Sequence, residues 1–175
     1  GGVARLVFIN NVLLSISQRK VTSIYIGEQV ITDSTQGDVV LSVSNTFFGN
    51  NRPLLQDWGT QHPESVFVYN GYIYGADQKM QLIWRYAGDG LNAISDYKVK
   101  SKSELAGRTS IIGQFDEYKS EAVFTLIGGS PAITIAFSEP KNRWTAFYSF
   151  TPEAYGQSGN NIVSLISGRL WLHDT

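Results

Sequence analysis

Hydrophobic and polar positions alternate in short runs along most of the chain, with turn residues between the runs. Examples are "VFVYNG", "YIYGAD" and "EAVFTLIG". Such runs are typical of antiparallel strands, because successive side chains of a strand point to opposite faces of the sheet. The pattern predicts a loop over residues 46–65 and strands over residues 4–10, 12–17, 23–32, 38–45, 66–71, 72–77, 82–88, 109–116, 121–128, 132–139, 144–150, 161–167 and 169–174.

One segment favours a helix instead. In "SDYKVKSKSELA", residues 95–106, a Ser or Asp at the start can cap a helix, and Gly107 follows as a stop signal. We expect a short surface helix or turn there.

A hairpin-like unit recurs along the chain. "VFVYNGYIYGAD" (residues 66–77) and "VSLISGRLWLHD" (residues 163–174) share Val, Gly and Asp at the same offsets. A similar turn opens "FDEYKSEAVFTL", and "ADQKMQLIW" and "IAFSEPKNRW" each lead from such a turn to a tryptophan. An Asp or Ser can cap a tight turn, Gly supplies a positive φ, and the aromatic side chain packs between sheets.

Repeated hairpins of this kind predict an all-β, β-propeller-like protein built from antiparallel hairpins. At roughly 40 to 50 residues per blade, the 175 residues form about four blades, or part of a larger propeller. An irregular β-sandwich is the alternative. Residues 1–175 are expected to form one β-rich domain or a fragment of a longer chain.

Composition excludes several classes of function. Fourteen basic and fifteen acidic residues give a net charge of -1 without blocks of like charge, so we expect no specific nucleic-acid ligand. The chain has no cysteine, which excludes disulfides and thiolate chemistry. Its apolar runs fall short of the roughly 20 residues of a membrane span, so no membrane insertion is expected.

The histidines suggest chemistry that the surrounding sequence does not support. His62 lies close in sequence to Asp57, Glu64 and Ser65, so the residue types of a Ser/His/Asp catalytic triad are present. The G-x-S-x-G pattern of a nucleophile elbow is absent, and we expect this loop to brace the fold. His62 and His173 have no metal-ligand spacing, and His173 is expected to be an exposed strand residue.

The carboxylates are interpreted in the same way. Asp116, Glu117, Glu121, Glu139 and Glu153 all sit at predicted turns, where a solvated or capping carboxylate is expected. No phosphate-binding or calcium-binding pattern occurs in the glycine-rich turns. We therefore predict that the protein is not an enzyme and has no catalytic, cofactor-binding or metal-binding residue.

Aromatic residues are the remaining signal. They alternate with other residues along the strands, which favours packing between sheets over stacking on a sugar. The set comprises Trp58, Tyr69, Tyr72, Tyr74, Trp84, Tyr86, Trp144, Phe147, Tyr148, Phe150, Tyr155 and Trp171.

Two stretches carry a family resemblance. The first joins the loop "DWGTQHPES" to "GYIYGAD", the strand "IWR" and "ISD"; the second joins "EPKNRWTAFYSFTPE" to "GRLWLH". In this order they resemble segments of large virion structural proteins of crAss-like and other short-tailed phages. The resemblance covers residues 57–175. It assigns structural roles to Asp57, Gly59, Pro63, Glu64, Gly71, Asp77, Trp84, Asp96, Trp144, Pro152, Glu153, Gly168 and Trp171.

The resemblance implies a location and partners. Similar proteins form the tail nozzle or muzzle and often contain a β-propeller. The chain is thus expected in the virion tail, acting in tail assembly with other tail proteins and with copies of itself. A carbohydrate- or receptor-binding module that contacts a host-surface glycan is the alternative. A glycosidase-like propeller enzyme is the third hypothesis.

Overall fold

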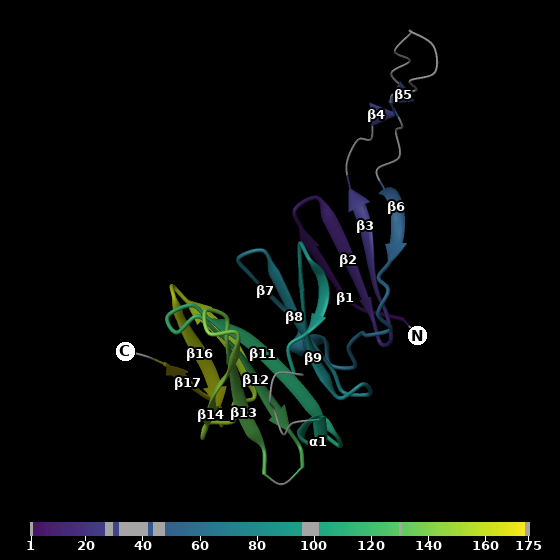
Figure 1. Cartoon of the computed structure of the whole chain (residues 1–175). Coiled ribbons are helices and arrows are strands. Elements are labelled where there is room, and N and C mark those ends of the chain that lie inside the picture. The colour runs from purple at the N-terminus through teal and green to yellow at the C-terminus, as the bar shows by residue number, and fades with distance from the viewer. Residues whose placement is uncertain are drawn as a thin grey trace.

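The protein folds into four antiparallel β-sheets that follow one another along the chain (Figure 1). The computed structural model describes residues 2–26, 30–31, 42–43, 48–95, 102–129 and 131–173. Sheet 1 contains β1 (Val3–Ile9), β2 (Val12–Ser17), β3 (Val21–Ile26) and β6 (Phe48–Pro53). Sheet 2 contains β7 (Phe67–Tyr69), β8 (Tyr72–Asp77), β9 (Leu82–Ala87) and β10 (Gly90–Ala93).

The other two sheets continue this order. Sheet 3 contains β11 (Ser110–Asp116), β12 (Glu121–Ile127), β13 (Ile133–Ser138) and β14 (Arg143–Tyr148), and sheet 4 contains β15 (Ala154–Ser158), β16 (Asn161–Ile166) and β17 (Arg169–Leu172). A small pair, β4 (Val30–Ile31) and β5 (Ser42–Val43), lies between β3 and β6 in sequence. The described helical segments are the 3₁₀ turn η1 (Pro63–Ser65) and the single-turn helix α1 (Lys102–Leu105).

The sheets lie in a row from sheet 1 near the N-terminus to sheet 4 near the C-terminus (Figure 1). The first strand of sheet 3, β11, contacts both β7 and β15, the first strands of its neighbours. Up-and-down sheets whose first strands meet are the arrangement of propeller blades. The predicted all-β, propeller-like fold is confirmed.

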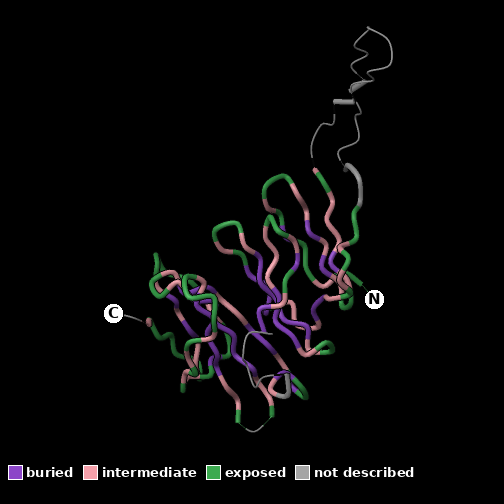
Figure 2. Tube along the Cα trace, viewed as in Figure 1, coloured by how far each residue is buried: buried purple, intermediate pink, exposed green. Residues whose placement is uncertain are grey.

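The middle sheets are buried on both faces, which a two-layer sandwich does not require. On β12, Ala122, Phe124 and Leu126 belong to the core shared with sheet 2, whereas the alternate residues Val123 and Thr125 are buried on the opposite face. Figure 2 shows such buried stretches along the inner sheets and exposed residues at the turn tips.

Two apolar cores hold the row together. The core between sheets 1 and 2 contains Val7, Leu14, Ile16, Val21, Val66, Ile73, Leu82, Trp84 and Leu91. The core between sheets 2 and 3 contains Phe67, Tyr74, Ala76, Ile83, Ile94, Leu105, Ile111, Phe115, Ala122, Phe124, Leu126, Ile135 and Phe137. Because β8 supplies Ile73 to one core and Tyr74 to the other, its alternation joins three sheets.

The recurring turn predicted from sequence is present between several strands. Asp77 Oδ1 accepts the Met80 N–H and Asp116 Oδ1 accepts the Lys119 N–H, both at 3.1 Å. Ser17 Oγ accepts the Lys20 N–H in the same way, also at 3.1 Å. A side-chain oxygen that binds the N–H three residues later fixes such a turn.

The two matching sequence units occupy different positions in their sheets. β7–β8 are the first and second strands of sheet 2, whereas β16–β17 are the second and third strands of sheet 4. What they share is the turn, since Asn70-Gly71 and Ser167-Gly168 all have positive φ, as a two-residue hairpin of type I′ requires. The sequence match therefore marks a turn type and not an equivalent blade position.

The strand prediction was wrong in three places. The predicted loop 46–65 contains β6, and β10 and β15 were not predicted. These strands are rich in Gly, Asn and polar residues, and they form because each pairs with a more apolar neighbour. β6 ends at Pro53, which an edge strand tolerates.

Other predictions fall partly on residues outside the description. Of the predicted strand 38–45, the described part is β5. The helix predicted over 95–106 is represented by α1, followed by Gly107 at φ +69°. Asp96 lies outside the described residues.

Candidate functional site

The loop from Asp57 to Ser65 joins sheet 1 to sheet 2. The Gly59 N–H donates to Asp77 Oδ2 at 2.8 Å, and Trp84 Nε1 donates to the Gly59 carbonyl at 2.8 Å. On the other side, the Thr60 N–H donates to the carbonyl of Ser17 at the end of β2, at 2.9 Å. One short loop thus has its backbone bonded to both sheets.

Gly59 is required for this close approach. A Cβ atom at this position would lie 2.1 Å from the Ser17 carbonyl oxygen and 2.7 Å from the Arg19 nitrogen. Both are backbone atoms that cannot move aside without disturbing the turn after β2. The contact explains a glycine at the centre of "DWGT".

The Ser/His/Asp set is not assembled. His62 Nε2 lies 2.8 Å from Gln78 Oε1, Ser65 Oγ donates to the His62 carbonyl, and Asp57 pairs with Lys20 at 2.6 Å. Each candidate side chain is engaged with a different partner. Ser65 lies in η1, where its Oγ also accepts the Ala76 N–H at 3.1 Å.

A half-buried polar contact joins sheets 2 and 3. Glu139 accepts a hydrogen bond from the Tyr74 hydroxyl at 2.8 Å and pairs with Arg85 at 2.7 Å. Burial, and then the bond to Glu139, raise the pKa of Tyr74 far above its ordinary value. Glu139 was expected to be a solvated or capping carboxylate, but it lies between sheets 2 and 3, where its side chain is only 16% exposed.

A second polar contact joins sheets 3 and 4. The hydroxyls of Thr125 and Thr134 lie 2.8 Å apart, and the Tyr155 hydroxyl lies 2.6 Å from Thr125 Oγ1. Burial raises the pKa of Tyr155 to about 12, although its bonds to the two threonines act in the opposite direction. This joint is made mainly of hydroxyl groups, unlike the two apolar cores.

The other turn carboxylates are also occupied. Glu121 is buried and accepts hydrogen bonds from Thr145 at 2.6 Å and Tyr148 at 2.8 Å. Glu117 accepts a hydrogen bond from the Gln157 side chain, which joins sheets 3 and 4. Glu121 was expected to be a solvated or capping carboxylate, but it is buried and accepts its hydrogen bonds from side chains of β14.

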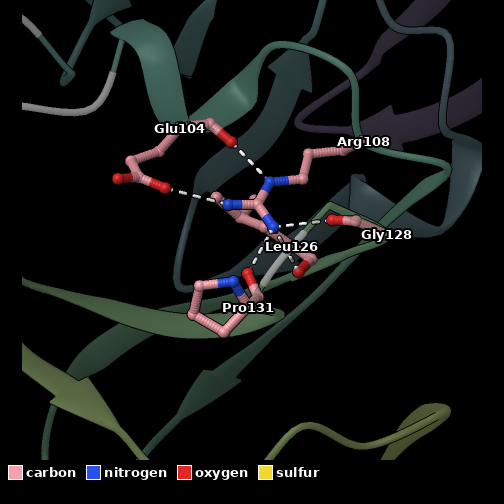
Figure 3. Close-up of polar contacts among 5 residues, drawn as sticks. All are labelled: Glu104, Arg108, Leu126, Gly128 and Pro131. Carbon is pink, nitrogen blue, oxygen red and sulfur yellow. Dashed lines mark hydrogen bonds and ion pairs between the residues drawn. The ribbon is translucent and has the colours of Figure 1, made fainter.

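Arg108 is a structural residue that the sequence analysis missed (Figure 3). Its guanidinium donates to the Glu104 carbonyl at 2.5 Å, to the Gly128 carbonyl at 2.6 Å and to the Pro131 carbonyl at 2.8 Å, and it pairs with the Glu104 carboxylate at 2.9 Å. It therefore fastens α1 to the turn between β12 and β13. The spacing of Glu104 and Arg108 is a helical signal, but nothing in the sequence indicates the carbonyl partners.

The remaining residues of the resemblance occupy joints and turns. Pro63 opens η1, and its carbonyl accepts a hydrogen bond from Arg5 of β1 at 3.1 Å. Trp144 Nε1 donates to the carbonyl of Ile94, the residue directly after β10, at 3.0 Å. Gly71 and Gly168 have φ of +82° and +72° in hairpin turns.

The C-terminal members of this set differ in exposure. Pro152 is buried, and Glu153 Oε1 accepts the Ser167 N–H at 3.1 Å. Trp171 is 53% exposed, and Glu64 is also exposed. His173 was predicted to be exposed but is half-buried, with Nε2 2.7 Å from Ser164 Oγ and its ring against Phe150.

A cavity of about 260 Å³ lies where the first strands of the sheets meet. Its walls include Arg5 from β1, Phe67 from β7, Gln114 from β11 and Tyr155 from β15. A space lined by the first strand of every sheet corresponds to the axis of a propeller.

The aromatic side chains mostly pack between sheets. Tyr74 and Trp84 are fully buried, and Tyr69 stacks on Phe115 of the next sheet with centroids 3.6 Å apart. Tyr148 and Phe150 stack on each other with centroids 5.1 Å apart. Buried rings cannot stack on a sugar.

Within the described residues, no cluster of His, Cys, Asp and Glu side chains is arranged to hold a metal ion, and no helix has the length and apolar character to cross a membrane. The sequence matches no protein-family model and no curated protein.

Proposed function

We propose that this chain is a structural module of a tailed-phage virion that acts in tail assembly, in or near the nozzle. The proposal rests on the resemblance of residues 57–175. It is supported by one observation: several of the residues that carry the resemblance make hydrogen bonds at the joints between sheets. Gly59, Asp77 and Trp84 fasten sheet 1 to sheet 2, and Trp144 fastens sheet 3 to sheet 2.

Residues that form hydrogen bonds between sheets favour a rigid structural module over a catalytic one. The carboxylates Asp77, Glu121 and Glu139 accept hydrogen bonds from the protein itself. A rigid row of sheets can present a constant surface to other tail proteins and to copies of itself, and symmetry would repeat each contact around the tail.

The test is to locate the protein in phage particles. An antibody raised against the chain is applied to purified virions that encode it, with gold-labelled detection by electron microscopy and mass spectrometry of the same particles. We expect gold at the tail and peptides of this chain in the particles. Peptides found in infected cells but absent from purified virions would contradict the proposal. If the protein is absent from virions and binds glycans, the receptor-binding alternative would be favoured.

A further inference from the structure

The two ends of the row each carry an uncovered apolar sheet face. On sheet 1, Phe8, Leu13 and Ile24 lie directly opposite one another across three strands, and Leu6 lies beside them. They alternate with Val7 and Leu14, which are buried against sheet 2. Phe8 is 60% exposed and Leu6 58%. We call Leu6, Phe8, Leu13 and Ile24 the first open face.

Sheet 4 has a matching surface. Leu165 lies opposite Leu170, and Val163 lies opposite Leu172. These positions alternate with Ile162 and Ser164, which are buried toward sheet 3. Leu170 is 76% exposed and Leu172 48%. We call Val163, Leu165, Leu170 and Leu172 the last open face.

The two open faces correspond to the two sides of the packing contact that joins consecutive sheets within the chain. Every inner sheet has one face toward the preceding sheet and one toward the following sheet, as β12 shows with Phe124 and Thr125. Among the described residues, no sheet packs on the outer face of sheet 1 or on the outer face of sheet 4. A surface of four apolar side chains with no charged residue suits another sheet face packed at roughly 10 Å.

We propose that a second copy of this chain covers these surfaces, with the last open face of one copy packed on the first open face of the next. The contact continues the row of sheets from one copy to the next, in the relation that neighbouring sheets have within the chain. It is a head-to-tail contact, which closes into a ring if the rotation allows. Two copies supply eight sheets, within the roughly four to eight blades of closed propellers. This inference rests on the proposed assembly function and names the surface used.

The test exploits the absence of cysteine from the chain. Two variants, Phe8→Cys and Leu170→Cys, are prepared separately and oxidised alone or as an equimolar mixture. We expect a disulfide-linked dimer from the mixture at a rate at least tenfold above either variant alone. Leu55→Cys mixed with Leu170→Cys is the matched control, because Leu55 is 95% exposed but belongs to neither open face.

Light scattering of the unmodified chain gives the second measurement. We expect a mass that rises with protein concentration, and a monomer for Phe8→Asp or Leu170→Asp, with Leu55→Asp unchanged. Dimers formed within one cysteine variant as fast as in the mixture would show face-to-same-face pairing and overturn the proposal. A monomeric chain with no mixed disulfide above the control would also overturn it. Gold at the tail with a monomeric chain refutes this contact alone, whereas association without virion location refutes the phage function alone.

Discussion

Gly75 and Trp84 form a single packing unit at the centre of sheet 2. The indole of Trp84 is fully buried and lies over Gly75, so that a Cβ at Gly75 would be 2.2 Å from Trp84 Cζ2. A strand glycine is normally unfavourable, but here it makes room for the largest side chain of the core.

Gly75→Ala should therefore destabilise the protein by roughly 1–3 kcal/mol, the usual effect of overpacking a core. Urea unfolding followed by tryptophan fluorescence measures the change. Gly88→Ala is the control, because its Cβ would meet no atom within 4 Å, and we expect a change within about 0.5 kcal/mol. Equal midpoints for both variants would contradict the packing argument.

Tyr155 gives a prediction about alkaline pH. Its pKa is about 12 in the folded protein and near its ordinary value of about 10 in the unfolded chain, so the unfolded state releases the proton first. The raised pKa of Tyr155 therefore stabilises the folded state fully below about pH 10, and this stabilisation is lost as the pH rises toward about 12. Tyr74 adds to the loss in the same direction.

In Tyr155→Phe, the free energy of unfolding should fall by on the order of 1–2 kcal/mol less between about pH 10 and 12 than in the unmodified chain. The variant should also be less stable at neutral pH, because the hydrogen bond to Thr125 is lost. Urea unfolding at several pH values is the measurement. Tyr118→Phe, at an exposed site, should leave the slope unchanged. A slope equal to that of the unmodified chain would contradict a raised pKa of Tyr155 in the folded protein.

At the scale of elements, α1 is too short to be stable alone. Its four residues form a single turn, which needs tertiary contacts to persist. Leu105 inserts into the core between sheets 2 and 3, and Arg108 ties the turn to the β12–β13 connection. The ion pair with the half-exposed Glu104 is expected to contribute little, because solvent screens an exposed charge.

Arg108→Met should cost roughly 1–3 kcal/mol, because the carbonyls of Gly128 and Pro131 lose their donor. The stability of Arg108→Lys should lie between that of the unmodified chain and that of Arg108→Met, because an ammonium group cannot reproduce the planar set of donors of a guanidinium. Urea unfolding compares both with the exposed control Arg143→Met, for which little change is expected. Similar losses for Arg108→Met and Arg143→Met would show that the carbonyl contacts contribute nothing.

At the scale of the whole molecule, the three joints between sheets differ in chemistry. Sheets 1, 2 and 3 are joined by large apolar clusters, whereas sheet 4 is held to sheet 3 by hydroxyl and amide contacts and a few apolar side chains such as Ile162. Apolar burial contributes more free energy than neutral hydrogen bonds, which partly replace bonds to water.

We expect sheet 4 to open before the rest of the molecule. In hydrogen exchange with mass spectrometry, amides of β15–β17 should exchange at least tenfold faster than those of β8, β9 and β12. The measurement is made on dilute protein, so that contacts between copies do not protect sheet 4. Uniform protection across all four sheets would show that the row unfolds as one unit.

The sequence alone determined the fold class and the local turns. Alternation of apolar residues, Asn-Gly and Ser-Gly turns, and Asp or Ser caps act within a few residues of each other, so they are visible in the chain itself. The tryptophans Trp84 and Trp144 were correctly expected to pack between sheets.

Only the tertiary structure decided which strands share a sheet and which polar groups are buried. β6, β10 and β15 form because a neighbour supplies their hydrogen bonds, and Glu139 and Arg108 are covered by residues far away in sequence. The two open faces could not be recognised either, because residues such as Phe8 and Leu170 have the same alternating pattern as buried ones. Alternation states that a strand has an apolar face, but the packing of whole sheets decides whether anything covers it.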